Sequence, residues 1–253
     1  MKPLILITND DGYQSAGIRA LVSVAKEFGN VMVMAPSHNA SGLAHSVTVS
    51  RPLRVNMISK VEGCSVYSCD GTPVDCMKIA QEFYCDRIPD IVLSGINHGS
   101  NSSINVLYSG TMGAVKEASL CGFPAVGFSL LSVREDADFN PSLPYVRKII
   151  HWVLENGLPD QVSLNVNIPV PDDGVIRGMM VCRQSKARWK DCYDRRTDPH
   201  GRPYFWLSGQ FECSDKGVGT DQYALENGYV SVVPTTTDST DFKYFELFKT
   251  VFE

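Results

Sequence analysis

The sequence lacks several features that would point to particular classes of protein. No run approaches the ~20 apolar residues of a membrane-spanning helix, and the first residues carry one lysine and a short apolar run, too little for a secretory signal. The net charge is -5 over 253 residues, so the chain has no basic field that would attract a nucleic acid. We therefore expect no membrane partner, no nucleic-acid partner and a cytoplasmic location.

The chain also lacks the motifs of several common enzyme classes. There is no GxxxxGK[ST] phosphate loop, no GxSxG elbow and no GxGxxG after the first strand. The 8 cysteines form no CxxC pair, and the 5 histidines form no HxH or HExxH spacing. These absences count against P-loop, serine-hydrolase, dinucleotide-dependent dehydrogenase and zinc chemistry. The cysteines are expected to be reduced and mostly buried.

What the sequence does contain is an alternation of short apolar runs and helical stripes. Apolar runs predict strands at residues 4–7, 31–35, 65–68, 90–94, 124–129 and 162–168. Between them, helical spacing predicts helices from Ser15 to Gly29, from Val74 to Tyr84, from Ser109 through Cys121 and across Val146 to Leu154. Such alternation favours an α/β fold with an open, doubly wound, mainly parallel, Rossmann-like sheet.

The composition changes near residue 170. We expect residues 1–170 to form the α/β catalytic core and residues 171–253 to form an extension of the same structural unit. The DPHG turn at 198–201 predicts a β-hairpin, and residues 228–233 predict a returning strand. A capped C-terminal helix begins near Ser239, with Phe245, Phe248 and Phe252 along one face. This extension is expected to cover the substrate or to contact another subunit, and we favour oligomer contacts.

Polar segments follow the predicted strands, where ligands bind in an open parallel sheet. If the sheet forms as predicted, six side chains can converge there: Asp10, Asp11, Ser41, Asn97, Ser109 and Thr111. Their oxygens are hard ligands that favour Mg²⁺, Mn²⁺ or Ca²⁺ over zinc or copper. The helix that starts at Ser109 offers free N–H groups to a phosphate. Together these features indicate metal-assisted hydrolysis of a phosphate ester.

Other interpretations stay open at this point. Each stretch alone is also compatible with a turn or a helix cap. One alternative function is an aspartyl-phosphate phosphatase, although its usual DxDx[TV] arrangement is missing. Another is a nucleotide-sensing or metal-sensing protein without turnover.

The same segments closely resemble the SurE, or survival protein E, family of nucleotidases. The matching stretches are ITNDDGYQSAGI, APSHNASG, DGTPVDC, DIVLSGINHGSN, YSGTMGA, LNVNIP and GTDQYALENGYVSVVPTTTD, in order across positions 7 to 238. The resemblance implies a phosphomonoesterase that cleaves nucleoside 5′- and 3′-monophosphates, and in some members short polyphosphate, with one divalent metal such as Mg²⁺ or Mn²⁺. It also implies a homodimer or homotetramer built through the C-terminal extension.

Carried over residue by residue, the resemblance implies four metal ligands: Asp10, Asp11, Ser41 and Asn97. Asp10 is also expected to be the catalytic base that assists the attacking water. The phosphate or substrate is expected to contact Asn9, Gly42, Gly99, Asn101, Ser109, Gly110 and Thr111.

The chain departs from the family pattern at His38, His98 and Ser100. The roles of the two histidines and of the basic, aromatic segment 183–196 stay open. So do the preferred base, the 5′ or 3′ ester, the physiological metal and the choice between dimer and tetramer.

Overall fold

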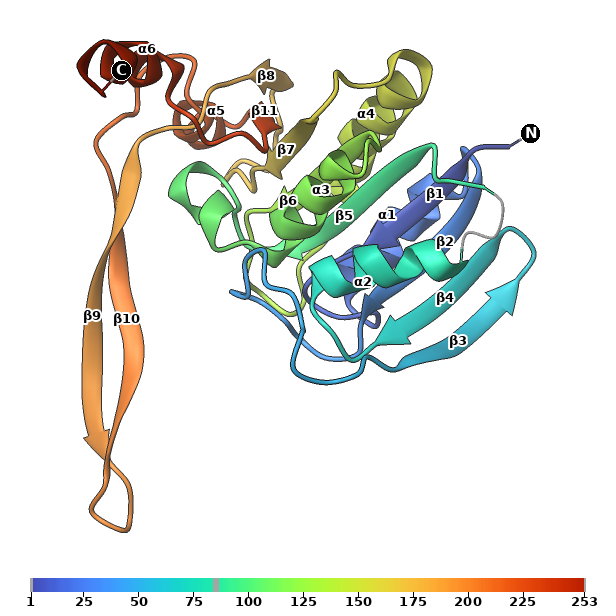
Figure 1. Ribbon diagram of the computed structural model, residues 1–253, viewed down its shortest axis with the longest axis horizontal. Helices are drawn as coiled ribbons and strands as arrows, with labels where there is room; N and C mark the ends of the chain where they lie inside the picture. The colour runs from blue at the N-terminus through green and yellow to red at the C-terminus, as the bar shows by residue number, and fades with distance from the viewer. Residues whose placement is uncertain (1, 84–86, 253) are drawn as a thin grey trace.

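The computed structural model describes residues 2–83 and 87–252 (Figure 1). Its strands are β1 (Leu4–Thr8), β2 (Asn30–Pro36), β3 (Val55–Val61), β4 (Cys64–Cys69), β5 (Ile91–His98), β6 (Ala125–Leu130), β7 (Val162–Ile168), β8 (Met179–Val181), β9 (Ala187–Thr197), β10 (Pro203–Cys213) and β11 (Val230–Thr236). Its α-helices are α1 (Ala16–Ala25), α2 (Pro73–Ala80), α3 (Gly110–Leu120), α4 (Leu143–Asn156), α5 (Asp221–Glu226) and α6 (Phe242–Phe252). Short 3₁₀ turns are η1 (Gln81–Phe83), η2 (Ser103–Leu107) and η3 (Asn140–Ser142).

Nine of these strands form one central sheet in the order β3-β4-β2-β1-β5-β6-β7-β11-β8. The strands from β4 to β7 are parallel along that order. β3 runs antiparallel to β4, and β11 runs antiparallel to β7. The predicted α/β, doubly wound and mainly parallel fold is confirmed.

Consecutive side chains of β1 explain why the sheet is covered on both faces. Ile5 and Ile7 pack in one buried cluster, whereas Leu6 packs in a second one. The first cluster includes apolar residues of α1 and α4, and the second includes residues of α2 and α3. Because neighbouring strand residues point to opposite faces, an uninterrupted apolar run is what a strand between two helix layers requires.

The predicted elements differ from the observed ones in a few places. α1 ends at Ala25, before Gly29, and α2 ends at Ala80. The predicted end of the second helix at Tyr84 lies outside the described residues. β3, β8 and α5 were not predicted. β3 has no continuous apolar run like those of the predicted strands, and six of its seven residues are exposed.

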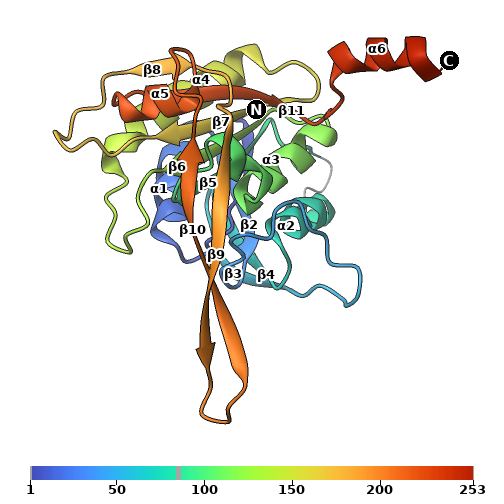
Figure 2. The same ribbon diagram turned by 90° about the vertical axis from the view of Figure 1, so that its left-hand side faces the viewer.

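The extension after residue 170 contributes directly to the sheet. β8 and β11 pair with each other at its edge, and β11 continues the sheet from β7. β9 and β10 leave the body as a long antiparallel hairpin closed by the predicted turn at residues 198–201 (Figure 2). α6 projects from the body beyond β11, and all of its residues are exposed. The division at residue 170 stays a prediction.

Two further expectations, on membrane-spanning helices and on the cysteines, can be compared with the described residues. Within residues 2–83 and 87–252, no helix is both long enough and apolar enough to cross a membrane. The seven cysteines in those ranges are free thiols, four of them buried, and Cys85 lies outside the described residues.

Candidate active site

A cavity of about 860 Å³ lies where the parallel strands end. Its walls come from the segments that follow β1, β2, β5 and β6, from the start of α3, from α5 and from the root of the β9–β10 hairpin. Seven of the predicted site residues line it: Asp10, Ser41, Gly42, Asn97, Gly99, Asn101 and Ser109. The structure therefore brings together segments from four different loops, as expected for the carboxyl ends of parallel strands.

Asp10 is the buried centre of this arrangement. Its side chain accepts a hydrogen bond of 2.6 Å from the Thr111 hydroxyl, and the residue is only 3% exposed. Burial raises the pKa of the Asp10 carboxyl above its usual value, the Thr111 hydrogen bond lowers it in part, and the charge of Asp11 raises it again. Gly110 allows this packing, since a Cβ there would lie 2.9 Å from the Cβ of Asp10.

Asp11 is half-buried beside Asp10 and contacts the last residue of β5. Its Oδ2 accepts the backbone N–H of His98 at 3.1 Å, and the His98 Nδ1 lies 3.4 Å from the same oxygen. Across the described part of the chain, no lysine or arginine forms an ion pair with either carboxylate. Two adjacent carboxylates without a lysine or arginine partner call for another source of positive charge.

The loop that carries Ser41 is fixed to the rest of the site through its backbone. The N–H of Ala40 donates to the carbonyl of Asp10 at 2.7 Å, and the N–H of Ala44 donates to the carbonyl of Tyr108 at 3.2 Å. Ser41 itself is exposed between these two anchors. Its hydroxyl is therefore accessible while its backbone position is constrained.

Asn97 reaches the cavity from an irregular part of β5. The pairing of β5 with β6 shifts register between Ser94 and Asn97, as in a β-bulge, which redirects the side chains that follow. The Asn97 amide nitrogen donates to the carbonyl of Gly99 at 2.9 Å, so the amide oxygen is the atom left for a ligand. α1 packs closely against this point, because a Cβ on Gly17 would lie 1.9 Å from the carbonyl oxygen of Ile96.

Ser109 begins α3 at the edge of the cavity. Its hydroxyl accepts the N–H of Met112 at 3.0 Å, which makes it the N-cap that the sequence predicts. The first turn of α3 therefore presents the positive end of the helix dipole to the cavity.

Four predicted site residues do not line the cavity. Gly110 and Thr111 lie behind Asp10 and contact it, and Asp11 lies beside it. The Asn9 amide donates to the carbonyl of Gly12 and to the hydroxyl of Ser15, both at 2.9 Å. These bonds turn its donors towards the start of α1 and away from the cavity.

Asn101 lines the cavity but is also held in a buried polar network. Its N–H donates to Asn167 Oδ1 at 2.8 Å, and its side-chain amide donates to the Ser129 hydroxyl at 2.8 Å. Asn165 in turn donates to the Asn101 carbonyl at 2.8 Å. The network gives the asparagines of the LNVNIP stretch a structural task, which is to fix the loop after β5.

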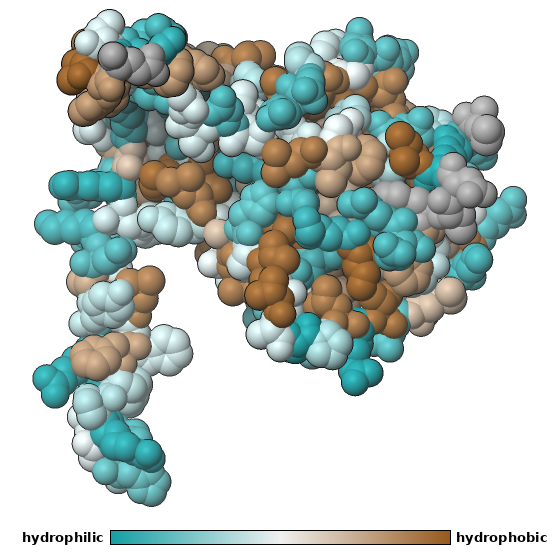
Figure 3. All heavy atoms as spheres, viewed as in Figure 1, coloured by the Kyte–Doolittle hydropathy of each residue, from teal (hydrophilic) through white to brown (hydrophobic). Residues whose placement is uncertain are grey.

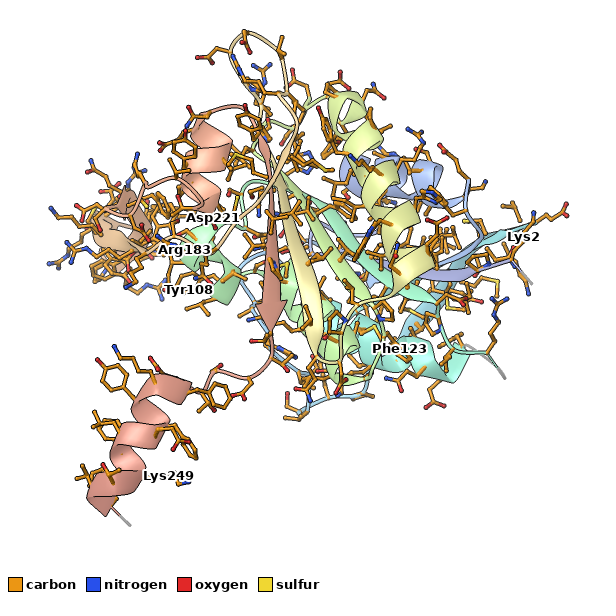
Figure 4. The ribbon with its side chains drawn as sticks, turned by 90° about the horizontal axis from the view of Figure 1, so that it is seen from above. Lys2, Tyr108, Phe123, Arg183, Asp221 and Lys249 are labelled. Carbon is orange, nitrogen blue, oxygen red and sulfur yellow. The ribbon has the colours of Figure 1, made fainter. Side chains whose placement is uncertain are left out.

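The sequence prediction missed one whole side of the cavity. That side is lined by Asn105, Tyr108, Trp189, Phe211 and Gln222 among others. Figure 3 shows the open recess between the hairpin and the body, and Figure 4 shows Tyr108, Arg183 and Asp221 gathered where the hairpin begins. Tyr108 directly precedes the SGT motif, and this position is the one sequence signal that could have identified part of that side. Nothing in the local sequence says which hairpin residues face the core.

The donor set fits a hard divalent cation. The Asp10 carboxylate, the Ser41 hydroxyl and the Asn97 amide oxygen line one cavity, and the Asp11 carboxylate lies beside it. Mg²⁺ and Mn²⁺ accept such oxygen ligands together with water. In the described ranges, no group of three or more histidine, cysteine, aspartate or glutamate side chains is placed to hold a metal. A cation at this site would be coordinated by two carboxylates and by neutral oxygens.

Comparison with known proteins gives a consistent result. Residues 5–191 match the family described as Survival protein SurE. The 5′-nucleotidase SurE of Flavobacterium psychrophilum is 51% identical over 241 residues, covering 94% of this chain and 93% of that protein. The same-named protein of Christiangramia forsetii is 52% identical over 241 residues, with the same coverage. The crystal structure of the SurE protein from Aquifex aeolicus has a TM-score of 0.84 at 37% identity, covering 99% of this chain and 100% of that one. The chain belongs to the survival protein SurE family.

Proposed function

We propose that this chain is a divalent-metal-dependent phosphomonoesterase that hydrolyses nucleoside monophosphates. The observation that carries the proposal is the position of Asp10, a buried carboxylate between Asp11 and the first turn of α3. The names of the relatives, 5′-nucleotidase SurE, support the 5′ ester as a substrate. Cleavage of 3′ esters and of short polyphosphate belongs to the same proposal.

The residues that would hold the cation are Asp10, Asp11, Ser41 and Asn97. When bound, a divalent cation at these oxygens supplies Lewis-acid polarisation of the phosphate ester and lowers the pKa of a water that attacks phosphorus. One such ion is proposed, with Mg²⁺ or Mn²⁺ as the candidates.

The chain's own groups supply binding and orientation. Ser109, which lines the cavity at the start of α3, binds the phosphate oxygens, because the start of a helix favours negative charge. The Thr111 hydroxyl holds one Asp10 oxygen at 2.6 Å and fixes the carboxylate. The other oxygen of Asp10 is then the candidate to take the proton from the attacking water.

The test is phosphate release by protein stripped with EDTA and then supplied with Mn²⁺, Mg²⁺ or neither. Substrates are 5′-AMP, 3′-AMP and tripolyphosphate. Release that depends on added metal, and that Asp10→Asn abolishes in folded protein, supports the proposal. Binding of AMP without release under all conditions would leave a nucleotide sensor. A trapped phosphoenzyme would replace the attacking water with an aspartate nucleophile.

We also infer that the extension joins subunits into a homodimer or homotetramer. The supporting observation is α6, where seven large apolar side chains are at least 47% exposed: Phe242, Tyr244, Phe245, Leu247, Phe248, Val251 and Phe252. A contiguous apolar surface of this kind favours association. Light scattering during gel filtration of the full chain and of Phe248→Glu tests this inference. A wild-type monomer across micromolar concentrations would reject it.

A further inference from the structure

The cavity has a side that the phosphate chemistry does not use. Besides Asp10 and Ser109, the lining includes the root of the hairpin, with Trp189 on β9 and Phe211 on β10. In the antiparallel register these two aromatic residues are direct partners. Their rings are 5.5 Å apart between centroids and inclined at 65°.

Trp189 is fixed in place although part of it is open. Its indole N–H donates to Asn105 Oδ1 at 2.8 Å, so its polar group is satisfied by η2 of the core. Phe211 supports the ring from the neighbouring strand. The residue is still 41% exposed and lines the cavity, so apolar ring surface remains uncovered there. An exposed aromatic face with a satisfied polar edge is suited to stacking.

The hairpin root itself is anchored to the core. Arg183 forms two hydrogen bonds with Asp215, of 2.6 and 2.9 Å, across the two segments that lead into the hairpin. The buried carboxylate of Asp221 accepts the N–H groups of Ser185 at 3.0 Å and Ser103 at 2.7 Å. These bonds join the root to the loop that carries Asn105. The wall is therefore preformed, and a ligand does not have to order it.

We propose that Trp189 is a specificity-determining residue, whose indole stacks on the base of a nucleoside monophosphate while the phosphate occupies the Asp10 end. The inference rests on the proposed function and adds to it the part of the substrate that the hairpin recognises. It predicts discrimination between nucleotides and phosphomonoesters that have no base. Base–aromatic stacking is worth roughly 5- to 150-fold in affinity.

The experiment uses the full chain with the metal that supports activity and compares 5′-AMP with ribose 5-phosphate. Trp189→Ala is expected to raise KM for AMP about tenfold, with kcat and the KM for ribose 5-phosphate unchanged. Trp189→Phe is expected to retain most of the discrimination, since it keeps an aromatic face. The matched control is Trp206→Ala, because Trp206 lies on the same hairpin, is 61% exposed and does not line the cavity.

Two results would overturn the inference: an unchanged KM for AMP in Trp189→Ala, or an equal rise in KM for both substrates. If Trp189→Ala does not fold by circular dichroism, Trp189→Leu provides the same comparison with an apolar side chain kept. If wild-type protein releases no phosphate, the proposed function fails but the inference is still tested by calorimetric binding. Tighter binding of AMP than of ribose 5-phosphate, abolished in Trp189→Ala, supports stacking, and equal affinities refute it.

Discussion

The hydroxyl of Thr111 donates a hydrogen bond of 2.6 Å to the carboxylate of Asp10, although the two residues are 101 positions apart in the chain. Both are buried, Thr111 completely. The bond joins the end of β1 to the first turn of α3. It therefore sets the orientation of the carboxylate and reduces the rise in the Asp10 pKa that burial causes.

Replacing Thr111 by valine removes this bond and keeps the shape of the side chain. A hydrogen bond to a charged group is worth about 1.5–3 kcal/mol, so we expect kcat/KM to fall about 10- to 150-fold. The pKa of Asp10 rises further, which moves the acidic limb of the pH–rate profile to higher pH. Phosphate release from about pH 3.5 to about pH 8, which spans the usual ~3.9 for Asp and neutrality, measures both effects. Thr111→Ser should behave nearly as wild type, and wild-type kinetics in Thr111→Val would contradict the assignment.

Asp10→Asn is expected to stabilise the metal-free protein at neutral pH. The folded-state pKa of Asp10 is raised by burial, so the folded protein holds the proton more tightly than the unfolded chain. Stability therefore falls as pH rises from the ordinary value near 3.8 through the raised one. Thermal melting in EDTA should give a higher Tm for Asp10→Asn at pH ~7, with the difference vanishing towards pH ~4. Identical melting curves at all pH values would show that the buried charge is compensated.

Gly110→Ala is expected to disturb the carboxylate of Asp10 directly. The added Cβ would lie 2.9 Å from the Asp10 Cβ and 3.1 Å from its Oδ2, so the side chain has to move. Moving a reacting group by about 1 Å lowers the rate about tenfold to hundredfold. Gly217→Ala is the matched control, since its Cβ meets nothing within 4 Å. Equal kcat/KM in the two variants would exclude a need for close approach at Gly110.

Asp221→Asn is expected to weaken the joint between core and hairpin. The carboxylate, 1% exposed, accepts backbone N–H groups from Ser103, Ser185 and Gln222 on its two oxygens. An asparagine NH₂ would face an N–H donor on one side, at a cost of about 1–3 kcal/mol. The urea midpoint should fall at unchanged m-value. Asp172→Asn, at an exposed position, should leave the midpoint in place, and an equal midpoint for Asp221→Asn would refute the prediction.

The core of the fold was predictable because its elements carry strong local signals. Ile5–Ile7 is buried on both faces, and Ser109 caps α3 through its own side chain. β3 could not be predicted in the same way, because six of its seven residues are exposed. It forms through pairing with β4 and not through a buried face.

The residues of the candidate site also fall into two groups, those that the sequence predicts and those that depend on tertiary structure. The oxygen donors around Asp10 lie at or just beyond the carboxyl ends of buried strands, so the topology of a parallel sheet brings them together. Asn9 has the same sequence context, but its amide is engaged by Gly12 and Ser15. Trp189 lies on a hairpin whose contact with Asn105 depends on tertiary structure alone. No local pattern records that contact.

The hairpin is inserted between two strands that pair with each other in the central sheet, β8 and β11. A protease cut at its exposed tip, near Gly201, would therefore separate the chain into two pieces that each retain one strand of the hairpin and one strand of the sheet edge. The pieces would stay associated through eleven residue pairs in the hairpin, three between β8 and β11 and six between β7 and β11. The tip is thus the place at which this chain could be divided into two complementing fragments, separately produced and recombined.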